Sequence, residues 1–365
     1  MSFIYQLRAW PEFEIDFEQI GETLERVTRK QGALVGKLRA AGFPLQEETL
    51  LHVLTSDLIK SSEIEGELLA TDEVRSSIAR KLGMEIGGLI PSDRHVDGLV
   101  EMLLDATQKC DEPLTKERLF GWHSTLFPTG YSGTISIKTG EWRDDRDGPM
   151  QVVSGALGRE RVHFKAPDAA YVSDEMERFL QWFNASSRMA PVIKAAIAHF
   201  WFVTIHPFDD GNGRIARAIA DMLLTRSEGM NQRYYSMSAQ IRKERNAYYS
   251  ILEKSQRGDL DITPWIEWFL NCLYAALEDS EAGLETTFQK SNFWEINRHV
   301  SMNERQTAMV NRLLDGFVGK LTSSKWAKIC KCSPDTALRD INDLIAKEVL
   351  VKDQSGGRST AYLLK

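Results

Sequence analysis

The residues whose types could do chemistry lie close together in the segment 206–217, HPFDDGNGRIAR. His206 carries an imidazole with an ordinary pKa of about 6.5, suited to accepting a proton from a hydroxyl. Gly211, Asn212 and Gly213 tolerate positive φ, so that several backbone N–H groups can converge on one point. If a helix begins there, its N-terminus favours a phosphate. The segment therefore predicts an anion site beside a base.

Two arginines and a carboxylate extend this site. Arg214 and Arg217 are three residues apart, so they share one helical face and can contact two phosphates of a polyphosphate. Asp210 precedes them and could hold Mg²⁺ together with phosphate oxygens, because magnesium commonly takes only one or two protein carboxylates. Taken alone, a histidine after an apolar helix or a Gly-Asn-Gly turn is usually structural. Their combination in twelve residues favours a functional site.

Two helices must position this loop. Residues 190–205, APVIKAAIAHFWFVTI, are apolar on nearly every face, which predicts a helix buried in the centre of a bundle and ending at His206-Pro207. Good helix formers resume after the glycines and predict a second helix over about 214–224.

Most of the chain shows the 3.6-residue hydrophobic period, so we expect a mainly α fold. Further helices are predicted at 47–69, 169–184, 243–256 and 263–278. Between residues 140 and 167, glycines, a proline and short β-type runs predict a hairpin. No internal repeat interrupts this pattern.

The tail predicts a winged helix-turn-helix: a helix after 303, a short helix from 322, a helix at 335–346 and a hairpin at 349–363. Residues 303–365 hold 11 Lys/Arg against 7 Asp/Glu, a net charge of +4, which leaves −11 on the rest. The helix at 335–346 would be the recognition helix. The tail offers only Arg339 and Lys347 as obvious basic contacts, fewer than sequence-specific readers generally present. Binding to DNA and a role as a dimer or partner module all stay open.

Composition bounds these interpretations. The 365 residues exceed the usual size of one core, and 42% hydrophobic with 27% charged residues is typical of a soluble globular protein. The net charge of −7 argues against wrapping of nucleic acid along the whole surface. We expect a cytoplasmic protein without a membrane span, because the start lacks a secretory pattern and no apolar run is long enough. Four scattered cysteines are expected to be reduced thiols.

A glutamate upstream is expected to contact the loop. Leu54, Leu58, Ser61 and Glu65 follow one another at helical spacings, which predicts that Glu65 lies on the buried side of the helix at 47–69. A buried glutamate needs a partner, and Arg217 is the cation we expect there. The pattern S-x-x-x-E-G also recurs by chance in helices.

The segment 206–217 resembles the signature of Fic-domain proteins, HPFx(D/E)GNGRxxR, at every defined position, and the similarity runs from about 45 to 280. The resemblance implies a helical bundle with a β-hairpin flap that transfers AMP from ATP to a Tyr, Ser or Thr hydroxyl of a target protein, releasing pyrophosphate. It implies that His206 deprotonates the hydroxyl and that Asp210 binds Mg²⁺. By the same resemblance, backbone at 211–213 and Arg214 hold phosphates, Arg217 fixes the γ-phosphate, and Phe208 anchors the loop.

Residues 61–66, SSEIEG, resemble the Fic inhibitory motif, (S/T)xxxE(G/N), with Ser61 and Glu65 at its defined positions. The resemblance implies that Glu65 pairs with Arg217 and keeps the γ-phosphate from its productive pose. In some relatives the same glutamate orients a water that removes AMP from the target. Self-inhibited AMP transfer and AMP removal are thus both implied.

The flap and the adenine pocket follow from the same resemblance. Residues 151–155, QVVSG, resemble a flap that binds a target segment by strand addition, with Ser154, Gly155, Ala156 and Leu157 near the nucleotide. Tyr248 and Tyr249 resemble residues of the adenine side. Gln256 stands where relatives often have Asn, which leaves its bond to the base open.

These interpretations divide the chain into a helical extension (1–45), a Fic core with its inhibitory helix (46–280) and a winged-helix domain (281–365). A transcriptional regulator whose core senses nucleotide is a second hypothesis. A third is transfer of UMP or of a phosphorylated alcohol. The expected partners are ATP and a target protein bound at the flap, and a homodimer stays open.

Overall fold

The structure is a computed structural model that describes residues 2–365 except 41–42, 147, 155–160, 230–231, 315, 318 and 354–359. The chain forms two compact units, Met1–Ser280 and Glu281–Lys365. Helices of the first unit are α1 (Phe17–Ala40), α2 (Phe43–Ile64), α3 (Thr71–Lys81), α4 (Arg94–Gln108), α5 (Lys116–Leu126), α6 (Ala169–Asn184), α7 (Pro191–Ile205), α8 (Asn212–Glu228), α9 (Met237–Lys243) and α10 (Arg245–Gln256). The long helix α11 (Thr263–Ile296) begins in the first unit and ends in the second.

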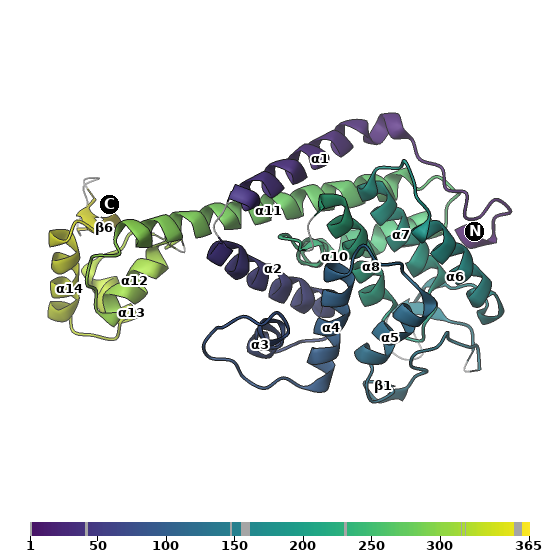
Figure 1. Ribbon diagram of the computed structural model, residues 1–365, viewed down its shortest axis with the longest axis horizontal. Coiled ribbons are helices and arrows are strands. Elements are labelled where there is room, and N and C mark those ends of the chain that lie inside the picture. Colours follow the sequence, from purple (N-terminus) through teal and green to yellow (C-terminus); the bar gives the residue numbers. More distant parts are fainter. Residues whose placement is uncertain are drawn as a thin grey trace. The chain divides into compact units, whose positions relative to one another are not determined.

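Helices α7 and α8 form the centre of the first unit and lie side by side (Figure 1). Every residue of α7 from Val192 to Ile205 is buried, as its apolar sequence predicts. Pro191 occupies the first turn, where a missing N–H breaks no hydrogen bond. The helix α8 is longer than the predicted interval of about 214–224 at both ends, because Asn212 and Gly213 lie in its first turn and it continues to Glu228, where Gly229 in the left-handed conformation ends it.

The surrounding helices pack closely on this centre. Along α1, Ile20, Val27 and Leu34 are buried on one face, a spacing of seven residues that is typical of an amphipathic helix. Where α4 approaches α5, a Cβ on Gly98 would lie 1.9 Å from the carbonyl oxygen of Thr125. The two backbones can therefore come this close only because residue 98 is glycine.

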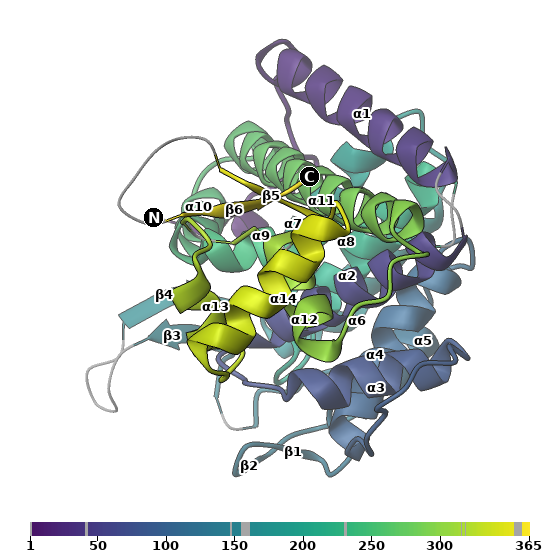
Figure 2. The same ribbon diagram turned by 90° about the vertical axis from the view of Figure 1, so that its left-hand side faces the viewer.

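Three small antiparallel sheets complete the described fold. They pair β1 (Tyr131–Ser132) with β2 (Ile135–Ser136), β3 (Gln151–Ser154) with β4 (Arg161–Lys165), and β5 (Leu350–Lys352) with β6 (Tyr362–Leu364). Figure 2 shows β3 and β4 as neighbouring strands of a hairpin, in the region where the sequence predicts one. None of the helices in the described ranges has the length and apolarity that a membrane span requires.

The second unit has a core of its own. It contains α12 (Glu304–Leu314), α13 (Ser323–Ile329) and α14 (Pro334–Ala346), and the buried Trp326, Ile341 and Leu344 lie in its centre. Ser333 caps α14 by accepting from the N–H of Thr336. These elements and β5–β6 follow the predicted order, whereas the winged-helix assignment stays a prediction.

Candidate active site

His206 lies at the C-terminal end of α7 with left-handed backbone angles, φ 54° and ψ 58°. Its Nδ1 is 3.2 Å from the carbonyl oxygen of Val203. A neutral imidazole that donates from Nδ1 to this carbonyl keeps the lone pair on Nε2. Burial lowers the pKa of His206 to about 4, so the ring is uncharged at neutral pH. The site therefore contains a neutral base whose tautomer is set by the end of α7.

Arg143 fixes the start of the loop, although the sequence did not single it out. Its guanidinium is buried, Nε donates to the carbonyl oxygen of His206 at 2.7 Å, and its backbone N–H donates to that of Pro207 at 2.9 Å. Asp145 balances the charge with an oxygen 3.0 Å from Nη1. An isolated arginine more than sixty positions upstream carries no spacing signal, so only the fold reveals this contact.

The side chain of Asn212 closes the loop on itself. Its Oδ1 accepts from the N–H of Phe208 at 3.0 Å, and its Nδ2 donates to the carbonyl oxygen of Phe208 at 2.7 Å. Phe208 is fully buried and stacks on the ring of His123, with 4.1 Å between centroids. Phe208 is therefore buried, as expected of a residue that anchors the loop, and it packs on His123, which the sequence did not predict at this site.

The first turn of α8 forms the candidate anion site. The N-terminal N–H groups of a helix have no partner within it and attract negative charge. Gly211 precedes the helix with φ 79°, and a Cβ there would lie 2.9 Å from the ring of Phe127. A Cβ on Gly213 would lie 2.2 Å from Oε1 of Glu65. The Glu65 carboxylate thus lies directly over the turn where the sequence predicts phosphate.

Arg217 is paired with the predicted glutamate. Its Nη2 donates to Oε1 of Glu65 at 2.8 Å and to the carbonyl oxygen of Ser61 at 3.0 Å, and its Nε donates to the Ser61 hydroxyl at 2.9 Å. Only 3% of the Arg217 side chain is exposed. The two residues that the inhibitory motif predicts, Ser61 and Glu65, therefore both contact Arg217.

The predicted burial of Glu65 is wrong. Helix α2 ends at Ile64, the next glycine has φ 88°, and the N–H of Glu67 bonds back to the carbonyl of Ser62. This turn carries Glu65 out of the helical phase that predicted its burial. Its side chain is 32% exposed.

Arg214 has a carboxylate partner that the sequence did not predict. Its Nη1 donates to Oε2 of Glu67 at 2.9 Å, and its guanidinium lies 5.1 Å from the ring centre of Phe127. The other oxygen of Glu67 contacts Nε2 of His95, whose Nδ1 is 2.9 Å from the carbonyl oxygen of Leu126. Burial acts to raise the pKa of Glu67, but His95 and Arg214 outweigh it and hold that pKa below the ordinary value. Glu67 is therefore an anion at neutral pH.

Asp210 is held at the rim of the anion site. Its Oδ1 accepts from the N–H of Gly211 at 2.6 Å, and its Oδ2 contacts the hydroxyl of Ser132. The described residues contain no group of three or more His, Cys, Asp or Glu side chains placed to hold a metal. A single carboxylate is still suited to Mg²⁺, which completes its coordination with phosphate oxygens and water.

A network of buried charged side chains joins α2 to α8, one turn of α8 after Arg217. Arg233 lies between Asp57 of α2 and Asp221 of α8, with N–O distances of 3.6 Å and 2.6 Å, and all three side chains are at most 3% exposed. Burial raises the pKa of Asp221 to about 7. The helix that carries Ser61 is thus fixed to the helix that carries Arg217.

The flap residues are described only in part. Strand β3 ends at Ser154, whereas Gly155, Ala156 and Leu157 lie outside the described residues. Val153 and Val162 face each other across the hairpin and are 47% and 40% exposed. Each strand has one neighbour in the described sheet, which leaves an outer edge for strand addition.

The residues predicted for the adenine side contact helices near the site. Tyr248 is buried, with its hydroxyl 2.9 Å from Nε2 of His199. The Tyr249 hydroxyl is 3.4 Å from the carbonyl oxygen of Ile64, at the end of α2. Gln256 is buried and donates to the hydroxyl of Thr204 at 3.2 Å. Their contact with a nucleotide base stays a prediction.

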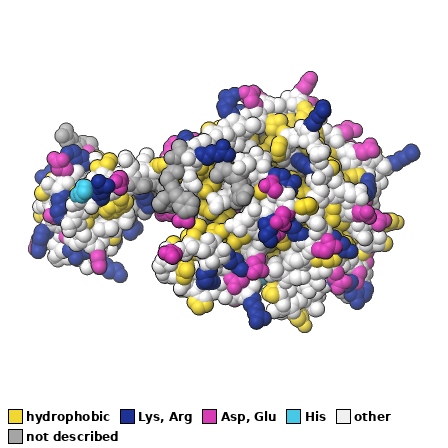
Figure 3. Space-filling model, viewed as in Figure 1, with side chains coloured by type: hydrophobic (Ala, Val, Ile, Leu, Met, Phe, Trp, Pro, Cys, Tyr) yellow, Lys and Arg dark blue, Asp and Glu magenta, His cyan; other side chains and the backbone are white. Residues whose placement is uncertain are grey.

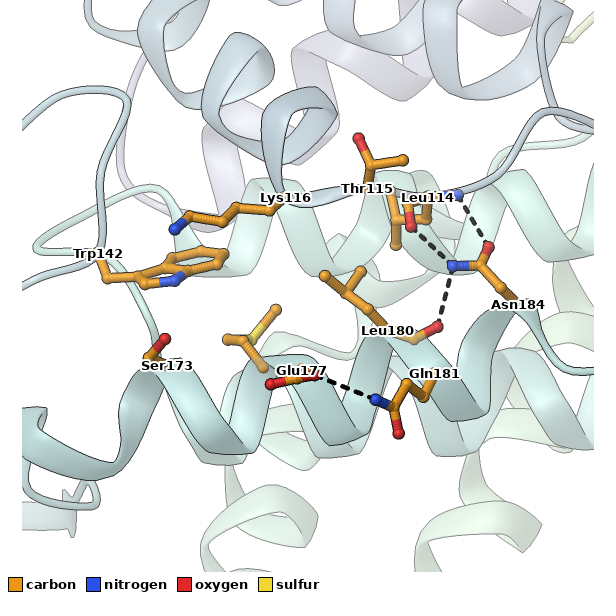
Figure 4. A pocket seen from close by; sticks show the side chains of 10 residues that line it. Leu114, Thr115, Lys116, Trp142, Ser173, Glu177, Leu180, Gln181 and Asn184 are labelled. Atoms are coloured by element: carbon orange, nitrogen blue, oxygen red, sulfur yellow. Dashed lines mark hydrogen bonds between the residues drawn. The ribbon is translucent and has the colours of Figure 1, made fainter.

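Two cavities differ in their relation to the site. One, of about 20 Å³, lies behind Arg214 and Arg217 and is large enough for about one water molecule. The other, of about 490 Å³, lies between α6 and the start of α5 (Figure 4). Trp142 lines this cavity, and the centre of its ring lies 5.1 Å from that of Phe208. The larger cavity contains no residue of the 206–217 segment.

The model of the Fic/DOC family matches residues 113–224, which run from the start of α5 through most of α8 and include the whole loop. The chain carries a Fic domain. The preceding residues 3–84, with α1, α2 and α3, match a model described as a domain of unknown function, DUF4172. The match to DUF4172 therefore includes Glu65 and Glu67, the two residues that contact arginines of the Fic domain.

Relatives agree with this assignment. Over 105 residues, the chain is 37% identical to "Protein adenylyltransferase Fic" of Drosophila yakuba and, over a stretch of the same length, 36% identical to that of Drosophila melanogaster. The match covers 28% of this chain and 20% of each relative, so the chain spans about a fifth of the length of these curated relatives.

Solved structures show the same fold. A Fic family protein from Desulfovibrio desulfuricans G20 has a TM-score of 0.51 and 20% identity, covering 94% of this chain and 96% of that one. A Fic domain containing signaling protein from Bacteroides thetaiotaomicron VPI-5482 has a TM-score of 0.53 and 20% identity, covering 71% and 97%. The predicted mainly α Fic bundle is confirmed.

Proposed function

We propose that this Fic-domain protein transfers AMP from ATP to a Tyr, Ser or Thr hydroxyl of a target protein, including itself, and that Glu65 restrains the reaction. The observation that carries the proposal is the neutral His206 next to the N-terminus of α8, with two buried arginines on that helix. The name of the Drosophila relatives, protein adenylyltransferase, supports the kind of group transferred.

The proposed reaction uses the chain's own groups in order. Nε2 of His206 accepts the hydroxyl proton, and the freed oxygen attacks the α-phosphorus of ATP. The bond from that phosphorus to the bridging oxygen breaks, and pyrophosphate leaves. N–H groups of the first turn of α8 and the two arginines stabilise the charge on the phosphates. Mg²⁺, held by Asp210 and phosphate oxygens, would supply further charge neutralisation.

Glu65 restrains this reaction by charge and by position. Its carboxylate pairs with Arg217 and lies over Gly213, so an incoming phosphate meets an anion at both contacts. Arg217 cannot neutralise the carboxylate and a triphosphate together. We expect Glu65→Gly to raise AMP transfer sharply.

The test is mass spectrometry of the Glu65→Gly protein after incubation with ATP and Mg²⁺, because self-modification reports donor, group and acceptor together. Glu65→Gly combined with His206→Ala is the matched control and should incorporate nothing. Equal incorporation by the wild-type and Glu65→Gly proteins would remove the restraint from the proposal. Incorporation that UTP suppresses better than ATP would change the group transferred.

Two other roles give different results in the same assays. The exposed part of Glu65 can contact water, so AMP released from a labelled target would add AMP removal as a second activity. A protein that binds ATP but labels nothing would instead favour a nucleotide sensor. For DNA, Figure 3 shows acidic and basic side chains interspersed on the visible face of the second unit. Salt-dependent binding of duplex DNA would be its test.

A further inference from the structure

Two arginines near the start of α8, Arg214 and Arg217, contact carboxylates from one short turn. Glu65 and Glu67 flank Gly66, whose left-handed backbone, with φ 88°, closes the end of α2. Glu65 contacts Arg217, and Glu67 contacts Arg214 at 2.9 Å. The turn therefore places two negative charges against the two side chains that are predicted to bind phosphate.

We propose that Glu67 is a second competitor of the nucleotide phosphates and occupies Arg214 as Glu65 occupies Arg217. The inference rests on the proposed function, because it concerns how strongly that site binds a polyphosphate. The segment 65–67 then supplies two carboxylates that compete with the phosphates. Removing Glu65 frees Arg217 but leaves Glu67 on Arg214.

The contacts of Arg214 favour competition. Only 6% of its side chain is exposed. The ring of Phe127 packs against the guanidinium, and Nη1 donates a hydrogen bond to Glu67. Within the described part of the chain, its Nε is buried without a hydrogen-bond partner. The remaining capacity of Arg214 for a phosphate is therefore reduced both in charge and in accessible donors.

His95 makes the exchange of partners feasible. One oxygen of Glu67 contacts Nε2 of His95 and the other contacts Arg214. If a phosphate displaces Glu67 from Arg214, the half-buried carboxylate keeps its bond to His95 and does not become unpaired. Glu67 can thus release the arginine without a large free-energy cost.

The opposite role would be positioning, with Glu67 orienting Arg214 toward the phosphates. The two roles predict opposite signs. Removing a competitor tightens binding of ATP, whereas removing a positioning group weakens it. Because Glu67 is 32% exposed and Arg214 is buried, we expect a change of about tenfold, between the effects of surface and buried ion pairs.

The experiment measures the affinity for ATP with Mg²⁺ by calorimetry in the full chain carrying Glu65→Gly and His206→Ala, which cannot consume the ATP, with and without Glu67→Gln. The matched control is Glu63→Gln, which removes the same charge from the same helix end but pairs with Lys60 and Arg242. We expect Glu67→Gln to tighten binding about tenfold and Glu63→Gln to change it less than twofold. An affinity that is unchanged or weaker in Glu67→Gln overturns the inference.

A second probe separates phosphate competition from a general change of the pocket. Inorganic tripolyphosphate, which has no base or sugar, should bind Glu67→Gln more tightly by a similar factor, whereas adenosine should not. Equal tightening for adenosine would overturn the inference. If the Glu65→Gly protein binds no ATP at all, the proposed function fails instead, so the two failures are distinguishable.

Discussion

Replacing Gly213 by alanine tests the position of the Glu65 carboxylate. The added methyl carbon would lie 2.2 Å from Oε1 of Glu65 and 3.2 Å from Nη1 of Arg217. Such a separation is too short for any contact, so the carboxylate must leave Arg217. The neighbour is the end of a side chain that is 32% exposed, and it can move toward solvent without unfolding the helix.

The magnitude follows from two opposing effects. Alanine in place of glycine stabilises a helix by up to about 1 kcal/mol. The lost bond between charged groups destabilises the protein by about 2 kcal/mol, since hydrogen bonds of this kind contribute about 1.5–3 kcal/mol and partial exposure lowers the value. We therefore expect Gly213→Ala to lower the free energy of unfolding by about 1 kcal/mol.

A double-mutant cycle makes the prediction specific. In a Glu65→Ala background the methyl group meets no carboxylate, so Gly213→Ala should raise the free energy of unfolding by up to about 1 kcal/mol. Urea unfolding of the four full-length proteins measures both changes. Gly121→Ala, whose Cβ meets nothing within 4 Å, is the helix control and should act alike in both backgrounds. The same effect of Gly213→Ala in both backgrounds would refute the reasoning.

Two further predictions concern stability. Gly98→Ala places a Cβ 1.9 Å from the carbonyl oxygen of Thr125, so it should destabilise the fold by about 3 kcal/mol, while Gly121→Ala should not; equal urea midpoints would contradict this. Burial lowers the pKa of His123 and His199 from 6.5 to about 4 and about 3. In this pH range the unfolded chain binds protons that the folded chain does not bind. As the pH is lowered from about 6.5 to about 4, the free energy of unfolding should therefore fall by about 3 kcal/mol for each histidine. His199→Gln should reduce the dependence of the urea midpoint on pH, and an unchanged dependence would contradict the assignment.

The sequence was most informative where neighbouring residues act together. The order His206, glycine turn, Arg214 and Arg217 places a base, a helix start and two cations within one loop, and local backbone rules suffice to predict this. The apolar run before it was enough to predict the buried helix α7, because burial on every face needs apolar residues on every face.

Where elements end was less well predicted. The helical count from Leu54 to Glu65 gave the correct partner, Arg217, but the wrong burial, since α2 ends one residue before Glu65. The hydrophobic spacing in a sequence can continue past the residue at which the backbone stops being helical. The turn at Gly66 was visible as a glycine, yet its effect on the direction of Glu65 depends on three-dimensional geometry.

The tertiary structure alone decided which distant groups surround the loop. Arg143, His123 and Glu67 reach it from separate segments, and none carries a motif or a spacing that points to residue 206 or 214. Their effect arises from contacts across long sequence separations, which depend on how helices pack. The physical reason is that the chemistry of the loop is set by residue types along the chain, whereas its charge balance is set by the neighbours that folding brings to it.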